Sequence, residues 1–545
     1  MTGLADGCAG LALVMGFAML ATRQPSAVFW CLAAQSAAVA GAAIFGQEPL
    51  LAAPPVAVTA AVWMVRQRAA AFGGTLAPVG VTPGIVLGLA LTMLCQYQAD
   101  IGLPLAVLLL AIILATVRRH PVQRLMALGA MQNAIVLAAG LAGWEGFLPL
   151  ACLALPLPFA ATLAAESHGL IARAWNGSLR HAPSWRGWAT FAACMAMFAA
   201  TLTVPLDSLG SVFAPLLALD GMVQAWIERK DATVPAASRI ALLLRVGLVL
   251  LAVFTADPVL AWMAVLGAAA TVLVPSGMSS GMSGGVPGSV SSGVPGGVPP
   301  GMTRHDRATL GYVGAGLALF GLLQLSQDPS AVAFLSLFGG YAVMAAVVPD
   351  LALPLLVLLL RFADGIDWPP AAGVLGTAIA VAALLGCAAL LPQAAGRAHR
   401  AVLLQLGQAS VAALAIATMQ PEGRYAAAVL LILLALTRAA CRVANGPAGV
   451  LALAGLAGLP PLGVFPGVVL VVLAVSSHAP WILLPLVAGL VPMLLAGLPP
   501  RLRLWPLRPA LLSIGWLPLA LALLFGFFTP AEFVRWLSAL TAGPS

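Results

Sequence analysis

The sequence is poor in charge and almost empty of lysine. Only 8% of its 545 residues are charged, against 62% that are hydrophobic, and the mean hydropathy is +1.04. A chain of this composition cannot form a water-soluble globule of the usual kind. Lys230 is the single lysine among 25 basic residues. This scarcity excludes a P-loop, which needs the lysine of a GK[ST] motif, and argues against a Schiff-base enzyme.

The usual signatures of metal and nucleophilic sites are also missing. The seven cysteines are scattered, mostly within apolar runs and without CxxC spacing, which indicates small packing residues. The sequence has no HExxH motif, no cluster of cysteine and histidine, and no pair of acids on a helix face. A serine or cysteine hydrolase would also lack its base at a typical spacing. We therefore expect no catalytic residue, no metal site and no cofactor bound by this chain.

What the sequence does have is a succession of apolar stretches. A bilayer is crossed by about 20 apolar residues, and the stretches, bounded by charges and by proline or glycine, number seven before the polar segment 166–186, four after it, and nine in 304–545. They fall at 8–22, 26–45, 49–65, 82–97, 102–117, 122–142, 147–165, 187–205, 209–227, 240–256, 258–275, 308–326, 331–348, 351–363, 370–391, 401–420, 425–441, 449–475, 480–498 and 510–529. The predicted fold is an all-α polytopic integral membrane protein with about 20 transmembrane helices.

The basic residues support these spans because they alternate with them. With the N-terminus outside, 22 of the 25 basic residues fall on the inner side, and 11 of the 17 acidic residues fall on the outer side. This pattern predicts a multi-pass protein of a bacterial inner membrane with both termini on the periplasmic side. The net charge of +8 is then a topology signal, and no nucleic-acid partner is expected. The N-terminus lacks a basic region, so we expect no cleaved signal peptide.

One segment, 276–303, is low in complexity, rich in glycine, serine and proline, and without charge. Such a tract cannot build a core, and its place in the topology predicts a cytoplasmic linker. Two interpretations stay open: a hinge between two membrane modules, or an expanded loop without a role.

Polar residues inside the predicted spans are few, and an ionisable group in lipid is costly enough to suggest a function. Asp220 is the only carboxylate well inside a span, where it fits a proton relay but also a pair with a neighbouring helix. Arg438, near an inner helix end, fits a snorkelling anchor better than a relay. Gln132 and Asn133, at mid-span, are expected to hydrogen-bond across helices. His399 lies beside arginines in an inner loop, where a solvated histidine is the default.

Two predicted helices are interrupted by proline and glycine, in FLPLACLALPLPFAATL and in LALAGLAGLPPLGVFPGVVLVV. A break at membrane depth frees backbone groups that need protein or water around them. Broken helices of this kind are common in ion-translocating proteins. The second break contains Pro460, Pro461, Gly463 and Phe465.

Two parts of the chain resemble known subunits. CAGLALVMGFAMLATRQPSAVFWCLAAQSAAVAGAAIF and LAVLLLAIILATVRRHPVQRLMALGAMQNAIVLAAGLAGW, within residues 1–170, resemble hydrogenase-4 component E, a relative of the K-type subunit of complex I. LLLRFADGI, GRAHRAVLLQLGQASVAALAIA and GLAGLPPLGVFPGVVL resemble the antiporter-like subunits of complex I and of group 4 membrane hydrogenases, a proton-conducting membrane transporter family. The last of these segments keeps Pro460, Pro461, Gly463 and Phe465 of the family's broken GLPPLxGF helix.

The resemblance implies a fusion of two neighbouring subunits. Residues 1–186 would form a seven-helix component E-like module, 187–275 the first four helices of an antiporter-like module, 276–303 the linker, and 304–545 a further nine helices. Such a chain would hold no cofactor of its own. Its partners would be the bilayer and other membrane and peripheral subunits, which carry iron–sulfur, nickel–iron or other redox centres.

The departures from the resemblance fall on the charged positions. Those families move protons through buried lysines and glutamates, and the corresponding positions here hold Ala60, Gln132 and Val468. The lysine of the HALTKALLF motif corresponds to Arg438, which does not deprotonate at usable cost. A relay needs groups that titrate near neutral pH. We therefore expect that the architecture is kept and that much or all of the proton-translocating chemistry is lost.

A further motif of the family, LPDxxxxAPxPVSALLSG, is reduced here to Pro349 and Asp350. Three functions remain as alternatives. The first is a non-catalytic membrane subunit of a hydrogenase-4-like or complex I-like assembly, linked to NADH or formate, that anchors redox subunits. The second is a still-active proton or cation arm using Asp220, water and Arg438. The third is a stand-alone permease for a small solute, which would leave the division into seven and 13 helices unexplained.

Overall fold

The computed structural model describes most of the chain up to residue 497. The described ranges are 2–22, 24–46, 48–66, 81–95, 102–118, 120–142, 148–167, 185–203, 208–229, 236–255, 257–273, 304–325, 330–363, 366, 368–394, 396–443, 446–460 and 462–497. All regular structure in these ranges is helical, and nine helices are long and apolar enough to cross a membrane. The prediction of an all-α polytopic membrane protein is confirmed. The predicted linker and the last predicted span, 510–529, lie outside the described residues.

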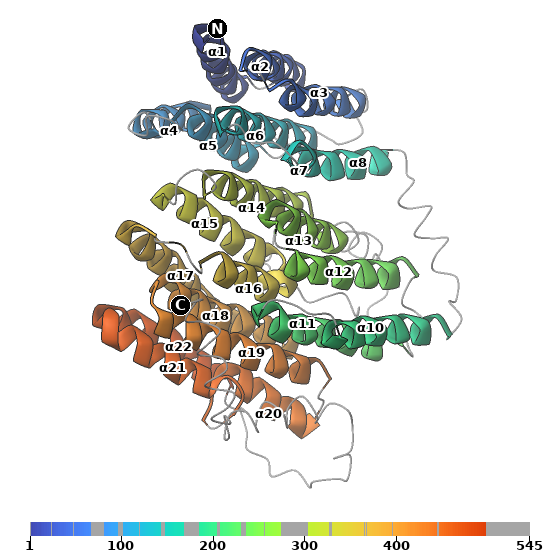
Figure 1. The fold of residues 1–545 in the computed structure, drawn as a ribbon, viewed down its shortest axis with the longest axis vertical. Coiled ribbons are helices and arrows are strands. Elements are labelled where there is room, and N and C mark those ends of the chain that lie inside the picture. The colour runs from blue at the N-terminus through green and yellow to red at the C-terminus, as the bar shows by residue number, and fades with distance from the viewer. Residues whose placement is uncertain are drawn as a thin grey trace. The chain divides into compact units, whose positions relative to one another are not determined.

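The chain forms two compact units (Figure 1). The first unit comprises Met1–Gly177, Asp257–Leu266 and Pro300–Asp328. Its helices are α1 (Thr2–Ala21), α2 (Pro25–Phe45), η1 (Pro49–Ala52), α3 (Ala53–Arg66), α4 (Val81–Cys95), α5 (Gly102–Val117), α6 (Pro121–Ala142), α7 (Leu148–Ala154), α8 (Pro156–Ser167), the first part of α13 (Pro258–Leu273) and α14 (Arg304–Leu325).

Helix α6 is the core of the first unit. Its membrane-spanning window is entirely buried, and α2, α3, α5 and α14 pack around it. A helix that is apolar on all sides is stable only when other helices or lipid surround it. At the N-terminal end of α6, Arg124 forms an ion pair with Asp306 of α14. This pair fixes α14 to a helix that lies about 180 residues earlier in the chain.

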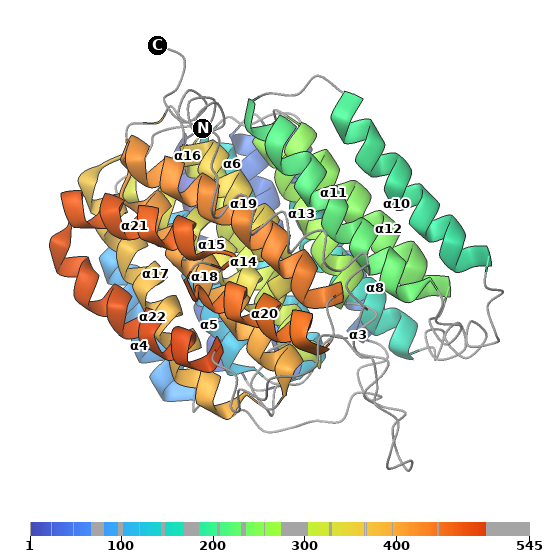
Figure 2. The ribbon, with the colours of Figure 1, turned by 90° about the horizontal axis from the view of Figure 1, so that it is seen from below.

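The second unit comprises Ser178–Ala256, Gly267–Pro299 and Pro329–Ser545. Its helices are α10 (Trp185–Thr203), α11 (Ser208–Glu228), α12 (Ala236–Phe254), α15 (Ala331–Val347), η4 (Pro349–Leu351), α16 (Ala352–Ala363), α17 (Pro370–Leu390), η5 (Leu391–Gln393), α18 (Arg397–Ala417), α19 (Pro421–Val443), α20 (Gly446–Ala457), α21 (Phe465–His478), η6 (Pro480–Ile482) and α22 (Leu483–Gly497). Helices α10, α11 and α12 lie side by side, and α18 packs between α17 and α19 (Figure 2).

Proline sets where many of these helices begin. Five long helices start at a proline, because the first helical position needs no N–H and proline already has the helical φ; these prolines are Pro25, Pro121, Pro258, Pro370 and Pro421. The surfaces left by the packing carry large apolar side chains, and Leu484, for example, is 80% exposed. Such a surface suits a hydrocarbon solvent, in which apolar side chains need no burial against protein.

Both predicted broken helices are broken. The first divides into α7 and α8 at Leu155. The second divides into α20 and α21, with Gly458 and Gly463 in the left-handed region at φ 83° and 54°. The break is closed by hydrogen bonds from the N–H groups of Gly458 and Val464 to the carbonyl of Gly455, at 3.1 and 3.2 Å. These bonds satisfy part of the backbone that the break exposes.

Candidate functional site

The second unit contains five charged side chains that converge between α11, α12, η4 and α19. We call them the ionic cluster: Asp220, Arg245, Asp350, Arg438 and Arg442. Their side chains are between 5% and 23% exposed. Charges removed from water to this degree are stable only when opposite charges and hydrogen bonds surround them.

Asp350 lies at the centre of the ionic cluster and accepts from three arginines. Its Oδ1 receives the Nη2 of Arg442 at 2.6 Å and the Nη2 of Arg438 at 2.8 Å. Its Oδ2 receives the Nη1 of Arg245 at 3.4 Å, and its main-chain carbonyl receives the Nη1 of Arg438 at 3.1 Å. One carboxylate thus joins α12 and α19 to the turn between α15 and α16.

Asp220 supplies the second negative charge. The Nη1 of Arg442 donates to both of its carboxylate oxygens at 2.9 Å, and the Nη2 of Arg438 lies 3.3 Å from its Oδ2. On the same face of α11, one and two turns further on, Gln224 accepts from Arg245 at 2.7 Å and donates to Glu228 at 3.0 Å. Three arginines are therefore opposed by two carboxylates directly and by a third, that of Glu228, through an amide.

The local sequence explains how these side chains meet. Arg438 and Arg442 are four residues apart on α19, so both point from one face of the helix. Pro349 cannot donate to a continuing helix, so α15 ends before it and Asp350 follows in the short η4 turn. The side-chain amide of Gln405, from α18, donates to the carbonyl of Pro349 at 2.9 Å and ties this turn to a fourth helix.

A small cavity of about 40 Å³ lies against the ionic cluster and is lined by all five of its residues. A water molecule needs about 10–15 Å³ of such space, so the cavity has room for a few. Water there would have guanidinium and carboxylate partners. The cavity thus offers space for water beside Asp220 and Asp350.

The chemistry open to the ionic cluster follows from its residue types. An arginine guanidinium does not deprotonate in proteins, and a carboxylate held by several guanidinium groups stays ionised. None of the residues that line the cavity is a histidine, lysine or cysteine. The cluster can therefore bind water or hold helices together through its ion pairs. Among the described residues, no three His, Cys, Asp or Glu side chains are placed to hold a metal ion.

A second polar feature lies at the break between α20 and α21. Gln408 of α18 is fully buried, and neither its amide nitrogen nor its amide oxygen has a hydrogen-bond partner among the described residues. A Cβ built on Gly458 would lie 3.4 Å from this amide nitrogen and 3.9 Å from a methyl group of Val468. Val468 is itself buried and apolar.

The first unit contains a buried group of neutral polar side chains on α2 and α6. Asn133 of α6 donates to the side-chain oxygens of Gln35 and Ser36 on α2, at 3.2 and 3.0 Å. Gln35 in turn donates to the carbonyl of Ala12 on α1 at 3.0 Å. The adjacent Gln132 is fully buried with no partner for either amide atom among the described residues. The expected bond across helices is therefore made by Asn133 and not by Gln132.

The contrast between Asn133, which is hydrogen-bonded, and Gln132, which has no partner among the described residues, can be tested with a matched pair of variants. Asn133→Leu should destabilise the purified protein by about 1–3 kcal/mol, because it leaves Gln35 and Ser36 buried without their donor. Gln132→Leu removes two unpaired polar atoms and should be neutral or stabilising. Thermal unfolding in detergent measures both variants. The interpretation is wrong if Gln132→Leu lowers the midpoint as much as Asn133→Leu does.

The other residues singled out by the sequence fall in different places. Asp220 and Arg438 come together in the ionic cluster, and Arg438 is buried and paired, with 5% of its side chain exposed, so it does not snorkel. His399 lies half-buried near the start of α18, outside the cluster. Pro460 and Gly463 lie in the break and Phe465 begins α21, while Pro461 lies outside the described residues.

Three members of the ionic cluster were missed by sequence reasoning as site residues: Arg245, Asp350 and Arg442. Arg245 and Arg442 counted only as charges of the inner side, and Asp350 counted as such a charge and as the remnant of a family motif. Helix α12 begins at Ala236, four residues before the predicted span, and this places Arg245 in the middle of the helix. The spacing of Arg438 and Arg442 was the available signal, since two arginines one turn apart on an apolar helix need anions nearby.

Comparison with known proteins gives a similarity among solved structures alone. No protein-family model matches the chain, and no curated protein matches it. Among solved structures, it is similar to a chain of "Respiratory complex I from Thermus thermophilus with bound NADH", with 18% identity and a TM-score of 0.47. That similarity covers 71% of this chain and 97% of the other.

Proposed function

We propose that this chain is a non-catalytic membrane subunit of a hydrogenase-4-like or complex I-like respiratory assembly, in which it anchors and braces the redox subunits. The proposal starts from the resemblance of residues 1–170 to hydrogenase-4 component E and of the later segments to antiporter-like subunits. In this proposal the chain is a fusion of two such subunits, with 276–303 as the cytoplasmic linker and both termini on the periplasmic side. The redox centres belong to its partners.

The observation that supports the non-catalytic role is that the two aspartates of the ionic cluster are paired with arginines. Asp220 is bound by Arg442 and contacts Arg438, and Asp350 is bound by three arginines. A proton carrier must be able to exist in both protonation states, and protonating either aspartate would leave arginines buried without a counter-ion. The positions where relatives would carry titratable groups hold Gln132 and Val468, both buried. The ionic cluster fits a brace between helices.

Assembly and proton flux can be tested separately. Deleting the gene should abolish the membrane complex on native gels, and the tagged chain should co-purify with subunits that contain iron–sulfur or nickel–iron centres. If the purified chain is instead monomeric and free of such partners, and binds a small solute, the alternative of a stand-alone permease is favoured.

A second candidate, a still-active proton or cation arm, is favoured by one observation. The cavity of about 40 Å³ lies directly against Asp220 and could admit water. We expect Asp220→Asn to lower the yield of the complex, because Asp220 neutralises Arg442, but to leave the proton flux per assembled complex unchanged, since in the first proposal no flux passes this residue. Glu422→Gln, which changes an exposed carboxylate, is the control. A large loss of flux confined to Asp220→Asn would establish the active arm and overturn the non-catalytic role.

A further inference from the structure

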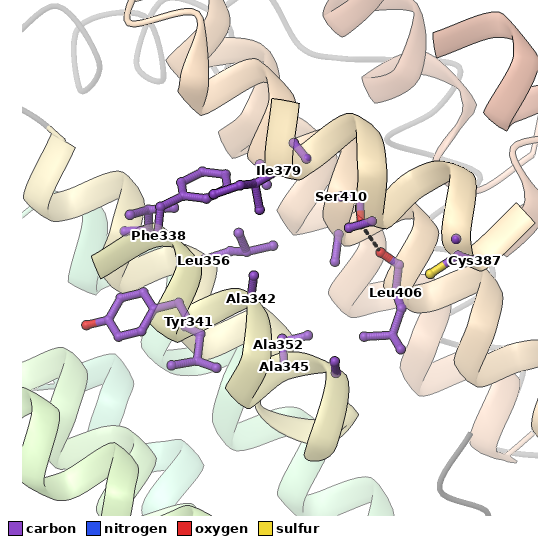
Figure 3. Close-up of a pocket in the computed structure, with 18 of the residues that line it drawn as sticks. Phe338, Tyr341, Ala342, Ala345, Ala352, Leu356, Ile379, Cys387, Leu406 and Ser410 are labelled. Atoms are coloured by element: carbon purple, nitrogen blue, oxygen red, sulfur yellow. Dashed lines mark hydrogen bonds between the residues drawn. The ribbon is translucent and has the colours of Figure 1, made fainter. Parts of the chain in front are cut away.

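An apolar cavity of about 310 Å³ lies in the second unit, between α15, α16, α17 and α18 (Figure 3). This volume is at the lower end of the range for small-molecule sites. Figure 3 shows Phe338, Ala342 and Leu356 on one side of the space and Cys387, Leu406 and Ser410 on the other. The cavity is separate from the ionic cluster, since the residues that line the two spaces do not overlap.

The lining offers few groups that could recognise a polar ligand, and the hydroxyl of Tyr341 is the one polar atom of the lining without a partner among the described residues. The hydroxyl of Ser410 donates to the carbonyl of Leu406 in its own helix at 2.9 Å. Figure 3 shows the ring of Tyr341 turned away from Leu406 and Ser410, so its hydroxyl does not face the opposite wall. The remaining lining residues are apolar. A lining of this kind favours a hydrocarbon chain over a polar occupant.

The cavity is open to the side of the unit. Ala346 of α15 and Gly386 and Leu390 of α17 line it and are also exposed, with Leu390 at 40%. Both α17 and α18 are long and apolar enough to span a membrane. An opening on such helices faces the hydrocarbon of the bilayer, so lipid tails are the molecules that reach it.

The length of the cavity matches one leaflet. On α18 it runs from Leu403 to Ala413, ten residues, which at 1.5 Å per residue is about 15 Å. The hydrocarbon core of a bilayer is about 30 Å thick, so one leaflet contributes about half of that. An acyl chain that enters at Leu390 and Leu403, near the end of α17 and the start of α18, would extend to about the middle of the membrane.

The same stripe of α18 ends in basic and polar groups. His399, Leu403, Leu406, Ser410 and Ala413 follow one another at spacings of four, three, four and three residues, so they share one helix face. Arg400, three residues before Leu403, lies beside this stripe. Both Arg400 and His399 are half-buried, so neither side chain is enclosed by the helix packing.

We propose that this cavity binds one acyl chain of an anionic phospholipid, with the phosphate held at the start of α18 by Arg400 and His399. In this proposal Arg400 and His399 bind the anionic headgroup, and the apolar side chains that line the cavity contact the acyl chain. The site is independent of the proposed role in a respiratory assembly, since it needs only this chain and a bilayer.

The test uses the purified full chain and native mass spectrometry of bound lipid, with phosphatidylglycerol and phosphatidylcholine offered in equal amounts. Wild type should retain one phosphatidylglycerol per chain, with at least tenfold preference over phosphatidylcholine. In Gly386→Leu the retention of phosphatidylglycerol should fall at least tenfold, because the larger side chain occupies part of the cavity. A Cβ at Gly386 meets no atom within 4 Å, so this substitution causes no backbone clash. Arg400→Gln should keep a bound lipid but lose the preference for phosphatidylglycerol.

Gly10→Leu is the matched control, because Gly10 is also in a transmembrane helix with no atom within 4 Å of an added Cβ and does not line the cavity. It should bind lipid as wild type does. The proposal is overturned if wild type retains no phospholipid, if Gly386→Leu retains as much as wild type, or if an isoprenoid quinone is recovered in place of the phospholipid. Equal loss in Gly10→Leu would also overturn it, since binding would then not depend on this cavity.

Discussion

Asp350→Asn is expected to be the most damaging single substitution in the second unit. The amide keeps the size of the side chain but removes the negative charge that three arginines share. Arg438 would then rely on Asp220 alone, which is already bound by Arg442. Breaking a buried ion pair by removing one partner costs about 3–5 kcal/mol, because the other charge stays buried without compensation. Thermal unfolding and the yield of monodisperse protein in detergent would measure the effect.

Two companions make this result specific. Glu422→Gln removes a carboxylate that is 65% exposed and pairs with His478 at 3.5 Å, so it should cost about 1 kcal/mol or less. Adding Arg438→Gln to Asp350→Asn should recover part of the lost stability, since it removes one uncompensated charge. If Asp350→Asn and Glu422→Gln shift the midpoint equally, the ionic cluster is not the brace proposed here.

Gly463→Val is expected to disrupt the break between α20 and α21. Gly463 has φ 54°, and a Cβ there would lie 2.5 Å from the carbonyl oxygen of Gly455, which closes the break. A left-handed L-residue costs about 1–2 kcal/mol, and overpacking adds about 1–3 kcal/mol. Together these predict a destabilisation of about 2–5 kcal/mol, measured by thermal unfolding.

Gly386→Ala serves as the comparison for that substitution. Gly386 also lies in the second unit, but its φ is not in the left-handed region and an added Cβ meets no atom within 4 Å. Replacing a helical glycine with alanine under these conditions should be neutral or stabilising by up to about 1 kcal/mol. An unchanged midpoint in Gly463→Val would show that the helix tolerates another geometry at the break.

The sequence was sufficient for the helices because the membrane allows few alternatives. Apolar stretches of about 20 residues must form helices in lipid, where every backbone group needs an internal partner. The expected span 122–142 is α6 (Pro121–Ala142), and 370–391 is α17 (Pro370–Leu390). The expected span 449–475 is a pair of helices, as its GLPPLG segment indicated. These outcomes depend only on local composition and on the conformations that proline and glycine adopt.

The sequence was insufficient for the sites because they depend on contacts between distant residues. Arg442 binds Asp220 across 222 positions of the chain and Asp350 across 92. The hydrophobic pattern gives each helix its length, but it does not say which helix faces which neighbour. The apolar cavity could not be predicted for the same reason. A run of alanine and leucine looks the same in the sequence whether its side chains fill a core or line a cavity.

By itself, then, the sequence determined that this protein is a bundle of transmembrane helices, where two of the helices break, and how few of its side chains could carry charge into the membrane. Only the tertiary structure decided that Asp220, Asp350 and three arginines form one cluster, and that four apolar helices leave a cavity between them. The physical reason is that helix formation in lipid is governed by neighbouring residues, whereas charge pairing and packing are governed by which helices meet.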